Sequence, residues 1–160
     1  MSQMTDATHP TVDFWRGAVV RLRAIETTDV ANFLRWNEDS ERGRLLDFLW
    51  PPQSEAAVRA WVEEQARRKL EGDAYHWVIE NAQGDAVGSI ATHHCNQRDG
   101  VFSYGLDIDC RHRRRGYARA AIGLVLRYYF DHLRYHKASV MVHGDNAASL
   151  RLLERLGFVR

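Results

Sequence analysis

The sequence has few cysteines, no long apolar run and no apolar N-terminal segment, and each scarcity argues against a class of protein. Its two cysteines, Cys95 and Cys110, are too few for a disulfide framework, so we expect two reduced thiols. The longest apolar run, residues 120–126, is far too short to span a membrane, so we expect no membrane partner. The first ten residues lack the apolar core of a secretion signal, and we therefore expect a cytoplasmic protein.

Charge of one sign is not in excess either. The 22 lysines and arginines nearly balance the 21 aspartates and glutamates, and a formal net charge of +1 argues against a nucleic-acid partner. No spacing of cysteine and histidine is typical of a metal site, so we expect no metal cofactor. His93, His94 and Cys95 are adjacent and would alternate between the two sides of a strand, although either histidine could titrate near neutral pH.

The remaining composition, 45% hydrophobic and 27% charged residues, is that of an ordinary globular domain. We expect one domain over residues 15–160, preceded by a polar, flexible segment at 1–14. Periodicity predicts strands at 17–25, 75–80, 86–94, 101–108 and 136–142. Helices are predicted to begin at 28 or 29, after Ser54, at 117 and at 147, with a loop at 38–53. This order predicts an α/β fold with a mixed sheet.

The segment Arg111-His112-Arg113-Arg114-Arg115-Gly116-Tyr117-Ala118 joins a predicted strand to a predicted amphipathic helix. The first N–H groups of a helix have no partner within the helix and attract anions, so a diphosphate can bind at such a turn. Gly116 lets the backbone approach a ligand closely, and the arginines can form forked hydrogen bonds to phosphate oxygens. The residue order is neither that of a P-loop nor that of a dinucleotide-binding turn. The alternative for such an arginine cluster is a solvated surface.

The pattern Arg-x-x-Gly-x-Ala at Arg113, Gly116 and Ala118 resembles the acyl-CoA pyrophosphate loop of the GNAT superfamily of N-acetyltransferases. A second string, residues 146–158, resembles another signature of that family, Asn-x-x-Ser followed by a helix that ends in Leu-Gly-Phe. Residues 20–29 are similar to the opening strand and helix start of the ribosomal-protein N-terminal acetyltransferases, the RimJ/RimL-like branch. The resemblance covers roughly residues 17–158.

The resemblance implies an N-acetyltransferase that moves the acetyl group of acetyl-CoA directly to a primary amine, either a protein N-terminus or a small amine. It implies a mostly antiparallel central sheet flanked by helices, with a splayed strand pair that binds acyl-CoA. It also implies that a backbone N–H within residues 106–108 meets the oxyanion. The residues expected to bind the co-substrate are Ile108, Arg113, Arg114, Arg115, Gly116, Tyr117, Ala118 and Asn146.

Two positions differ from the side chains that many relatives carry. Ser103 stands where many relatives have a glutamate, and Leu153 stands where many have a tyrosine acid. We expect Asp107, on the same strand face as Ser103, to bind the amine or accept its proton; the alternative is a surface acid at a loop edge. We expect Ser149 of the Asn-x-x-Ser motif to assist. Alternatively, Ser149 only begins the last helix and Asn146 only caps it.

The acceptor half of the sequence carries no signature. Residues 45–62 occupy the segment that covers the acceptor cleft in relatives, so we expect Phe48, Trp50 and Trp61 to shape the substrate site. The sequence ends at Arg160, where relatives continue through two more strands, and we therefore expect a sheet without its C-terminal strands. The sequence leaves open whether the protein forms a homodimer. The alternatives are a catalytically weak acyl-CoA-binding or regulatory protein and an RNA-associated protein.

Overall fold

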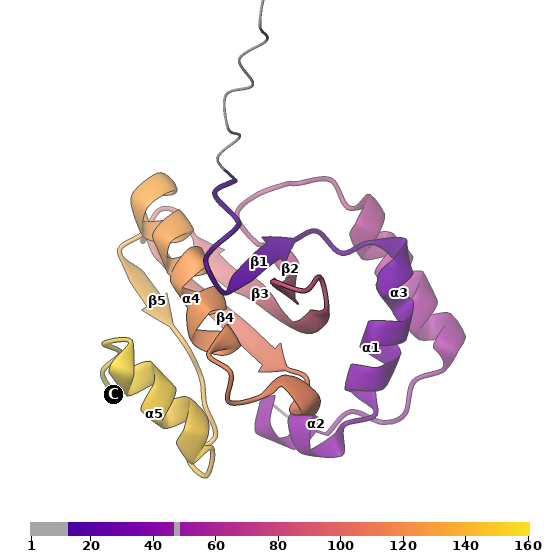
Figure 1. Ribbon diagram of the computed structural model, residues 1–160. Coiled ribbons are helices and arrows are strands. Elements are labelled where there is room, and N and C mark those ends of the chain that lie inside the picture. The colour runs from indigo at the N-terminus through magenta and orange to yellow at the C-terminus, as the bar shows by residue number, and fades with distance from the viewer. Residues whose placement is uncertain (1–12, 47–48) are drawn as a thin grey trace, which may run out of the picture.

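The computed structural model describes residues 13–46 and 49–160, and its centre is a five-stranded sheet (Figure 1). The strand order is β1-β2-β3-β4-β5. The antiparallel strands are β1 (Val20–Arg23), β2 (His76–Asn81), β3 (Ala86–Asn96) and β4 (Val101–Ile108), and β5 (Lys137–Ser139) pairs with β4 in parallel. The predicted mixed, mostly antiparallel sheet flanked by helices is therefore confirmed.

Helices cover both faces of the sheet. The α-helices are α1 (Val30–Asn37), α2 (Ser40–Leu46), α3 (Glu55–Arg67), α4 (Tyr117–Arg127) and α5 (Ala147–Arg155). Short 3-10 turns precede α1 and α4 as η1 (Thr27–Asp29) and η2 (Cys110–His112), and α4 continues into a π-helical turn, η3 (Tyr128–His132). Figure 1 shows α4 across the sheet and α5 beside β5, with α1 and α3 on the opposite side of the molecule.

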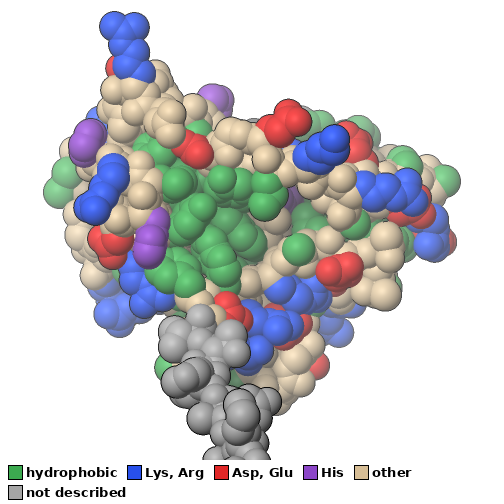
Figure 2. Space-filling view, turned by 90° about the horizontal axis from the view of Figure 1, so that it is seen from above, with side chains coloured by type: hydrophobic (Ala, Val, Ile, Leu, Met, Phe, Trp, Pro, Cys, Tyr) green, Lys and Arg blue, Asp and Glu red, His purple; other side chains and the backbone are tan. Residues whose placement is uncertain are grey.

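Two apolar clusters follow from this layering. The larger one lies between the sheet and α4 and includes Leu22, Ile90, Phe102 and Tyr129, all nearly or fully buried. The smaller one packs α1 and α3 on the other face through Phe33, Val62, Val78 and further residues. Burial of this apolar area stabilises the sheet from both sides and leaves its edges as the places where a ligand can enter. Figure 2 shows hydrophobic side chains gathered into one patch on the face seen from above.

The predicted loop at residues 38–53 is wrong in part, because α2 forms within it. The side chain of Asp39 accepts a hydrogen bond from the backbone N–H of Arg42 at 3.0 Å, which satisfies a free donor in the first turn. The side chain of Arg42 then reaches β4. By contrast, the predicted start after Ser54 is confirmed, because the Ser54 hydroxyl accepts from the N–H of Ala57 at 3.1 Å.

The pairing of β4 with β5 is short. Only Val101, Phe102 and Ser103 pair with β5, whereas β4 continues to Ile108. The predicted strand at 136–142 is correspondingly shorter than expected, because the chain leaves β4 after Ser139. Within the described residues, the edge of β4 from 104 to 108 that faces away from β3 therefore has no strand partner. This is the splayed strand pair that the resemblance implies.

Packing begins near the start of the described chain. The ring of Phe14, at the end of the segment predicted to be flexible, meets the rings of Trp15 and His132 edge-on at centroid distances of 5.2 and 4.8 Å. Residues 1–12 and Phe48 lie outside the described residues. Of the helices that are described, none combines the length and apolar character that crossing a membrane requires.

Candidate functional site

The turn before α4 has the backbone of an anion-binding site. Gly116 is the N-cap of α4 with a left-handed φ of +81°, and no side chain in the described part of the chain caps this helix. Arg114 also has a left-handed φ, +63°. No described atom lies within 4 Å of the place that a Cβ at Gly116 would take, so the space in front of the first turn is open. The free N–H groups of Tyr117 and Ala118 can therefore bind a diphosphate.

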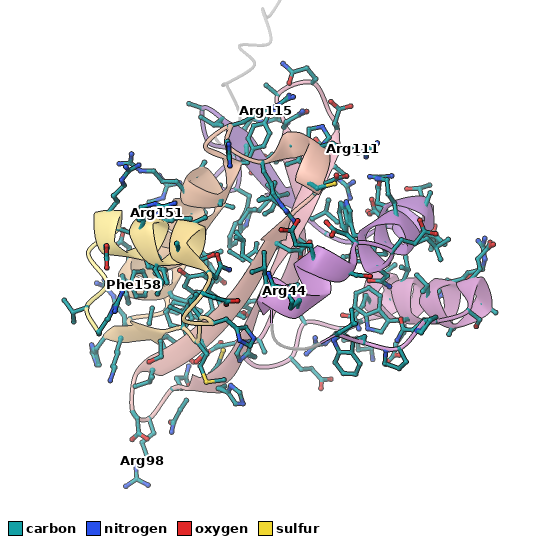
Figure 3. All side chains as sticks on the ribbon, turned by 90° about the horizontal axis from the view of Figure 1, so that it is seen from below. Arg44, Arg98, Arg111, Arg115, Arg151 and Phe158 are labelled. Atoms are coloured by element: carbon teal, nitrogen blue, oxygen red, sulfur yellow. The ribbon has the colours of Figure 1, made fainter. Side chains whose placement is uncertain are left out.

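The arginines of this turn have different tasks. Arg113 donates to the carbonyl of Ile108 at 3.3 Å and pairs with Asp39 at 3.2 Å, so its side chain ties the turn to β4 and α2. Arg114 and Arg115 are exposed, and neither has an ion pair within 13–46 and 49–160. Figure 3 shows Arg115 at the same end of the molecule as Arg111. From the sequence, we expect Arg113, Arg114 and Arg115 all to bind the co-substrate. Of these three, Arg114 and Arg115 have guanidinium groups that are available to phosphate.

Asp109 anchors the start of the turn, and the sequence analysis missed it. Its side chain is 3% exposed and accepts from Arg35 at 3.1 Å, from Trp36 at 3.2 Å and from the backbone N–H of Arg111 at 3.0 Å. Although burial acts in the opposite direction, the hydrogen bonds from Arg111, Arg35 and Trp36 hold the pKa of Asp109 well below its usual range. An aspartate directly after a strand and before a short turn is a capping signal that could have identified it.

The free edge of β4 leads from this turn into the sheet. The N–H and C=O groups on this edge have no partner strand, so an extended polar arm can hydrogen-bond to them. The carbonyl of Ile108 is already engaged by Arg113, which leaves the rest of the edge to a ligand. The edge ends at Ser103, where β5 closes it through Ser139. Turn and edge together fit a ligand with a diphosphate and a long amide-containing arm.

Asp107 lies on the opposite side of β4 from the larger apolar cluster. Its carboxylate accepts from Nε of Arg42 at 2.7 Å and from Oγ of Ser89 at 3.0 Å. The side chain is 9% exposed, so Asp107 is not a surface acid at a loop edge. Its pairing with Arg42 neutralises the charge that would attract a cationic amine.

Small side chains form the floor next to Asp107. The antiparallel register places Ser89 opposite Asp107, Ala91 opposite Gly105, and His93 opposite Ser103. Because side chains alternate along a strand, these residues share one face. No described atom lies within 4 Å of a Cβ built at Gly105, so the space above this floor is open.

His93 and His94 are both exposed, and their Nδ1 atoms are 2.7 Å apart. Burial and the neighbouring His94 lower the pKa of His93.

Asn146 and Ser149 come together at the start of α5. Oδ1 of Asn146 accepts from the backbone N–H of Ser149 at 3.1 Å, so Asn146 caps this helix. Both residues are half-buried. The turn before α5 is joined to α2 by an exposed ion pair between Arg44 and Asp145 at 2.8 Å. The capping role is thus present, and contact with a ligand stays a prediction.

The aromatic residues predicted to shape the acceptor site are not brought together in the described part of the chain. Trp61 packs between α1 and the sheet, with ring centroids 4.9 Å from Phe33 and 5.6 Å from His76. Trp50 is 63% exposed. The His76 imidazole that Trp61 contacts is buried, and this burial lowers its pKa to about 4. Trp61 therefore serves mainly as packing in the smaller cluster.

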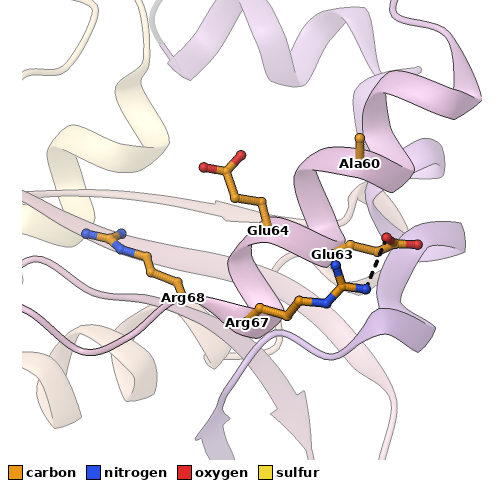
Figure 4. A pocket seen from close by; sticks show the side chains of 5 residues that line it. All are labelled: Ala60, Glu63, Glu64, Arg67 and Arg68. Carbon is orange, nitrogen blue, oxygen red and sulfur yellow. Dashed lines mark hydrogen bonds and ion pairs between the residues drawn. The ribbon is translucent and has the colours of Figure 1, made fainter.

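Two hollows lie away from this floor. Figure 4 shows one on α3, lined by Ala60, Glu63, Glu64, Arg67 and Arg68, where Glu63 and Arg67 form an ion pair. A second, polar hollow is lined by residues of β1, α1 and η2, including Arg23, Arg35 and Arg111. Its arginines are paired with Asp29 and Asp109. Among the described residues, no group of three or more His, Cys, Asp or Glu could hold a metal ion.

The site can now be set beside known proteins. The model of the acetyltransferase (GNAT) domain matches residues 20–159. The SPbeta prophage-derived uncharacterized N-acetyltransferase YokL of Bacillus subtilis is 36% identical over 149 residues, which are 93% of this chain and 81% of that protein. The crystal structure of the acetyltransferase (GNAT family) from Bacillus anthracis has a TM-score of 0.75 at 19% identity, over 91% of this chain and 82% of that one.

A further structure of this fold contains a ligand. The Vibrio cholerae spermidine N-acetyltransferase, in complex with CoA and spermine, has a TM-score of 0.75 at 24% identity, over 88% of this chain and 80% of that one. At these identities the two solved structures support the fold, and the family rests on the domain model and on the 36% identical relative. The uncapped helix that follows the splayed strand β4 agrees with the domain match over nearly the whole chain. On this match and the 36% identical relative, the chain belongs to the GNAT acetyltransferase family.

Proposed function

We propose that this protein transfers the acetyl group of acetyl-CoA directly to a primary amine, either a protein N-terminus or a small amine. The observation that carries the proposal is the continuous path from the uncapped N-terminus of α4 to the free edge of β4. Such a path suits a diphosphate followed by an amide-containing arm. We further propose that the chain belongs to the RimJ/RimL-like branch, on the likeness of residues 20–29.

The residues that would hold acetyl-CoA fit that role. The backbone N–H groups of Gly116, Tyr117 and Ala118 would bind the diphosphate, with the guanidinium groups of Arg114 and Arg115 beside them. Arg113 holds the turn in place through its contact with the carbonyl of Ile108. The free edge of β4, which ends at Ile108, would bind the amide-containing arm of acetyl-CoA. Asn146 would complete the site from α5. When bound, acetyl-CoA supplies an acetyl group that is activated as a thioester.

The chain itself would contribute position, electrostatics and proton transfer. A free backbone N–H of residues 106–108 would donate to the carbonyl oxygen as negative charge develops on it. The open floor above Gly105 would admit the amine beside this edge, which supplies rate through proximity. Asp107, held by Arg42 and Ser89, would accept the amine proton through the Ser89 hydroxyl or a water. Ser149 would assist from the first turn of α5.

Calorimetric titration with acetyl-CoA tests the cofactor site first. The native protein is expected to bind with a micromolar Kd, whereas Gly116→Asp/Ala118→Asp places two carboxylates on the diphosphate amides and should abolish binding. Ala56→Asp/Ala57→Asp is the matched control, because it adds two carboxylates to the exposed first turn of another helix, α3. A folded native protein that binds no acetyl-CoA would overturn the proposal.

An amine screen then separates the enzyme from a catalytically weak acyl-CoA-binding protein. Release of CoA thiol is measured with spermidine, free amino acids and peptides with a free N-terminus. Turnover that depends on one of these amines supports the enzyme, and binding of acetyl-CoA without turnover on any of them supports the binding protein. Asp107→Asn is expected to lower kcat at least tenfold and to leave the Kd for acetyl-CoA within about twofold. Light scattering of the same samples tests whether the protein forms a homodimer.

A further inference from the structure

His93 and His94 are neighbours in β3 whose side chains meet instead of separating. Successive side chains of a regular strand point to opposite faces, and the sequence accordingly predicts one histidine on each side of the sheet. In the structure their Nδ1 atoms are 2.7 Å apart, and the two rings stand nearly perpendicular, at 81°. Both side chains are exposed. The sequence prediction is therefore wrong here, and a local change in β3 brings the second imidazole to the first.

A β-bulge makes this change. The register of β3 against β4 is regular as far as His93, opposite Ser103, and then shifts before Asn96, which stands opposite Val101, so β3 has one residue more than β4 in this interval. His94 lies within the shift and has a left-handed φ of +48°, which is uncommon for a residue with a Cβ. Bulges re-aim side chains, and strained backbone is concentrated at functional sites. The convergence of the two imidazoles thus points to a ligand that they hold together.

Two imidazole nitrogens at this separation repel each other if both present lone pairs, so a cation or a proton must lie between them. In the free protein, one ring carries a proton on Nδ1 and donates it to Nδ1 of the other. A metal ion can take the place of that proton once the donor ring carries its proton on Nε2 instead. Burial and the neighbouring His94 lower the pKa of His93, which keeps this ring neutral at pH 7, the form that binds metals.

The distance between the two nitrogens favours one kind of ion. Imidazole suits Zn²⁺, Cu²⁺ and Ni²⁺, and its nitrogen binds such ions at about 2.0–2.1 Å. Two nitrogens at right angles around one ion are then about 3.0 Å apart, whereas two nitrogens of a tetrahedral site are about 3.4 Å apart. The observed 2.7 Å is nearer to the first value. The pair therefore favours Cu²⁺ and Ni²⁺, which accept square-planar or tetragonal geometry, over tetrahedral Zn²⁺.

The neighbouring thiol does not contribute a ligand. Cys95 donates to the carbonyl of Asp73 at 3.2 Å, and its sulfur lies 3.8 Å from the Tyr129 hydroxyl, in the larger apolar cluster. Burial raises the pKa of this thiol, so it stays protonated and is a poor metal ligand. Within residues 13–46 and 49–160, no third histidine, cysteine or carboxylate joins the two imidazoles. Water would therefore fill the remaining positions around an ion.

We infer that His93 and His94 form a two-nitrogen binding site for Cu²⁺ or Ni²⁺ at the end of the floor that carries Gly105. His93 is opposite Ser103, on the same face of the sheet as Gly105. An ion held there stands beside the open space above Gly105 and restricts the entry of an acceptor amine. The metal site itself is independent of the proposed function, and its effect on acetyl transfer rests on that function.

Calorimetry with nickel chloride, without acetyl-CoA, tests the site directly. The native protein is expected to bind one Ni²⁺ with a micromolar Kd. His93→Gln and His94→Asn should each weaken this binding at least about tenfold, because the second nitrogen of a linked pair binds intramolecularly. Asparagine tolerates the left-handed backbone at position 94, so this variant should fold. Electron paramagnetic resonance of the Cu²⁺-loaded native protein should show coupling to two imidazole nitrogens, with one coupling fewer in each variant.

His132→Gln is the matched control. It also removes an exposed histidine, but one whose ring packs on the rings of Phe14 and Tyr128, on the side of the larger apolar cluster. This variant should keep the native affinity for Ni²⁺. A loss of affinity in His132→Gln as large as in His94→Asn would show that the ion binds histidines without regard to the pair, and the site would be overturned.

The remaining outcomes separate this site from the proposed function. If the native protein binds neither ion, or if it binds Ni²⁺ no more tightly than His93→Gln and His94→Asn do, the metal site is overturned and the proposed function stands. A native protein that binds Ni²⁺ but not acetyl-CoA keeps the metal site and loses the acetyltransferase proposal. Once an acceptor is identified, saturating Ni²⁺ should lower the rate of acetyl transfer several-fold in the native protein and not in His94→Asn. A native rate that bound Ni²⁺ leaves unchanged would overturn the restriction of the amine.

Discussion

Arg42 donates a hydrogen bond from Nε to Oδ2 of Asp107 at 2.7 Å, and this ion pair joins α2 to β4. The two side chains are only 14% and 9% exposed. Arg42 is held further by the carbonyl of Trp36, to which its guanidinium donates at 3.1 Å. The helix α2, which contacts the Asp107 face of β4, is therefore fixed by a charge pair in the candidate site, and the pair serves both stability and the position of Asp107.

Replacement of Arg42 by methionine should leave the Asp107 carboxylate unpaired in a mostly buried place. We expect the free energy of unfolding to fall by about 2–3 kcal/mol, because removal of one member of such a pair leaves an uncompensated charge. Urea denaturation of Arg42→Met, Asp107→Asn and the double variant measures this. The double variant should be more stable than Arg42→Met alone, and strictly additive losses would show that the two side chains do not act as a pair.

Gly88 allows β3 to approach β4 closely, and its replacement should weaken the sheet. A Cβ at Gly88 would lie 2.1 Å from the backbone oxygen of Asp107, which cannot move without disturbing the strand pair. Gly88→Ala should therefore lower the free energy of unfolding by at least about 2 kcal/mol. Gly123→Ala is the control, because this α4 glycine has open space around it and alanine favours a helix, with an expected gain of up to about 1 kcal/mol. Equal effects at the two positions would contradict this account of Gly88.

The fold was largely predictable because its patterns are local. Alternating strands, the Ser54 cap and the sequence around Gly116 each act within a few residues, and the structure has the corresponding elements at those places. The exception is α2, which has no apolar stripe and depends on the contact between Arg42 and Asp107, 65 residues away. A pairing over that separation leaves no periodic signal in the sequence.

The candidate site was predictable only on its cofactor side. The turn at Gly116 would bind an anion through its backbone N–H groups, and a short motif can indicate such a turn. The acceptor side depends on register: no motif shows that His93 stands opposite Ser103 or that Ala91 stands opposite Gly105. The convergence of the two adjacent histidines likewise depends on a bulge in β3, which an adjacent pair in a sequence does not indicate.

Stability should depend on pH through His76. Its imidazole packs against Phe33 and Trp61, and burial lowers its pKa to about 4, opposed by Asp107 and reinforced by Arg42 and Arg68. The unfolded chain takes up this proton near pH 6.5, whereas the folded protein does so only near pH 4. Stability from this group is therefore fully present above pH 6.5 and is lost as the pH falls from 6.5 to 4, by about 3 kcal/mol.

Thermal unfolding at several pH values measures the contribution of His76. His76→Phe keeps an aromatic ring in the cluster and should flatten the fall in melting temperature between pH 6.5 and 4. His136→Gln replaces an exposed histidine outside the smaller apolar cluster, and it should keep the native pH profile. The carboxylates of Asp29 and Asp109, whose pKa values lie below the usual range, begin to lose their stabilising effect only below about pH 5, so the change between pH 6.5 and 5 is free of their contribution. A native profile in His76→Phe would contradict the assignment.

The arginines of the α4 turn should separate into a structural residue and two ligand-binding residues. Arg113→Gln removes the contacts with Ile108 and Asp39, so it should lower the melting temperature and change the Kd for acetyl-CoA mainly through the displaced turn. Arg114→Gln and Arg115→Gln remove exposed charges that have no ion pair within the described residues, so the melting temperature should stay within about 1 °C. Each should weaken acetyl-CoA binding several-fold at low salt and less at high salt, because phosphate attraction is screened by ions. Calorimetry at two ionic strengths distinguishes the two kinds of residue, and a loss of stability shared by all three variants would show that the whole arginine run serves the fold rather than the ligand.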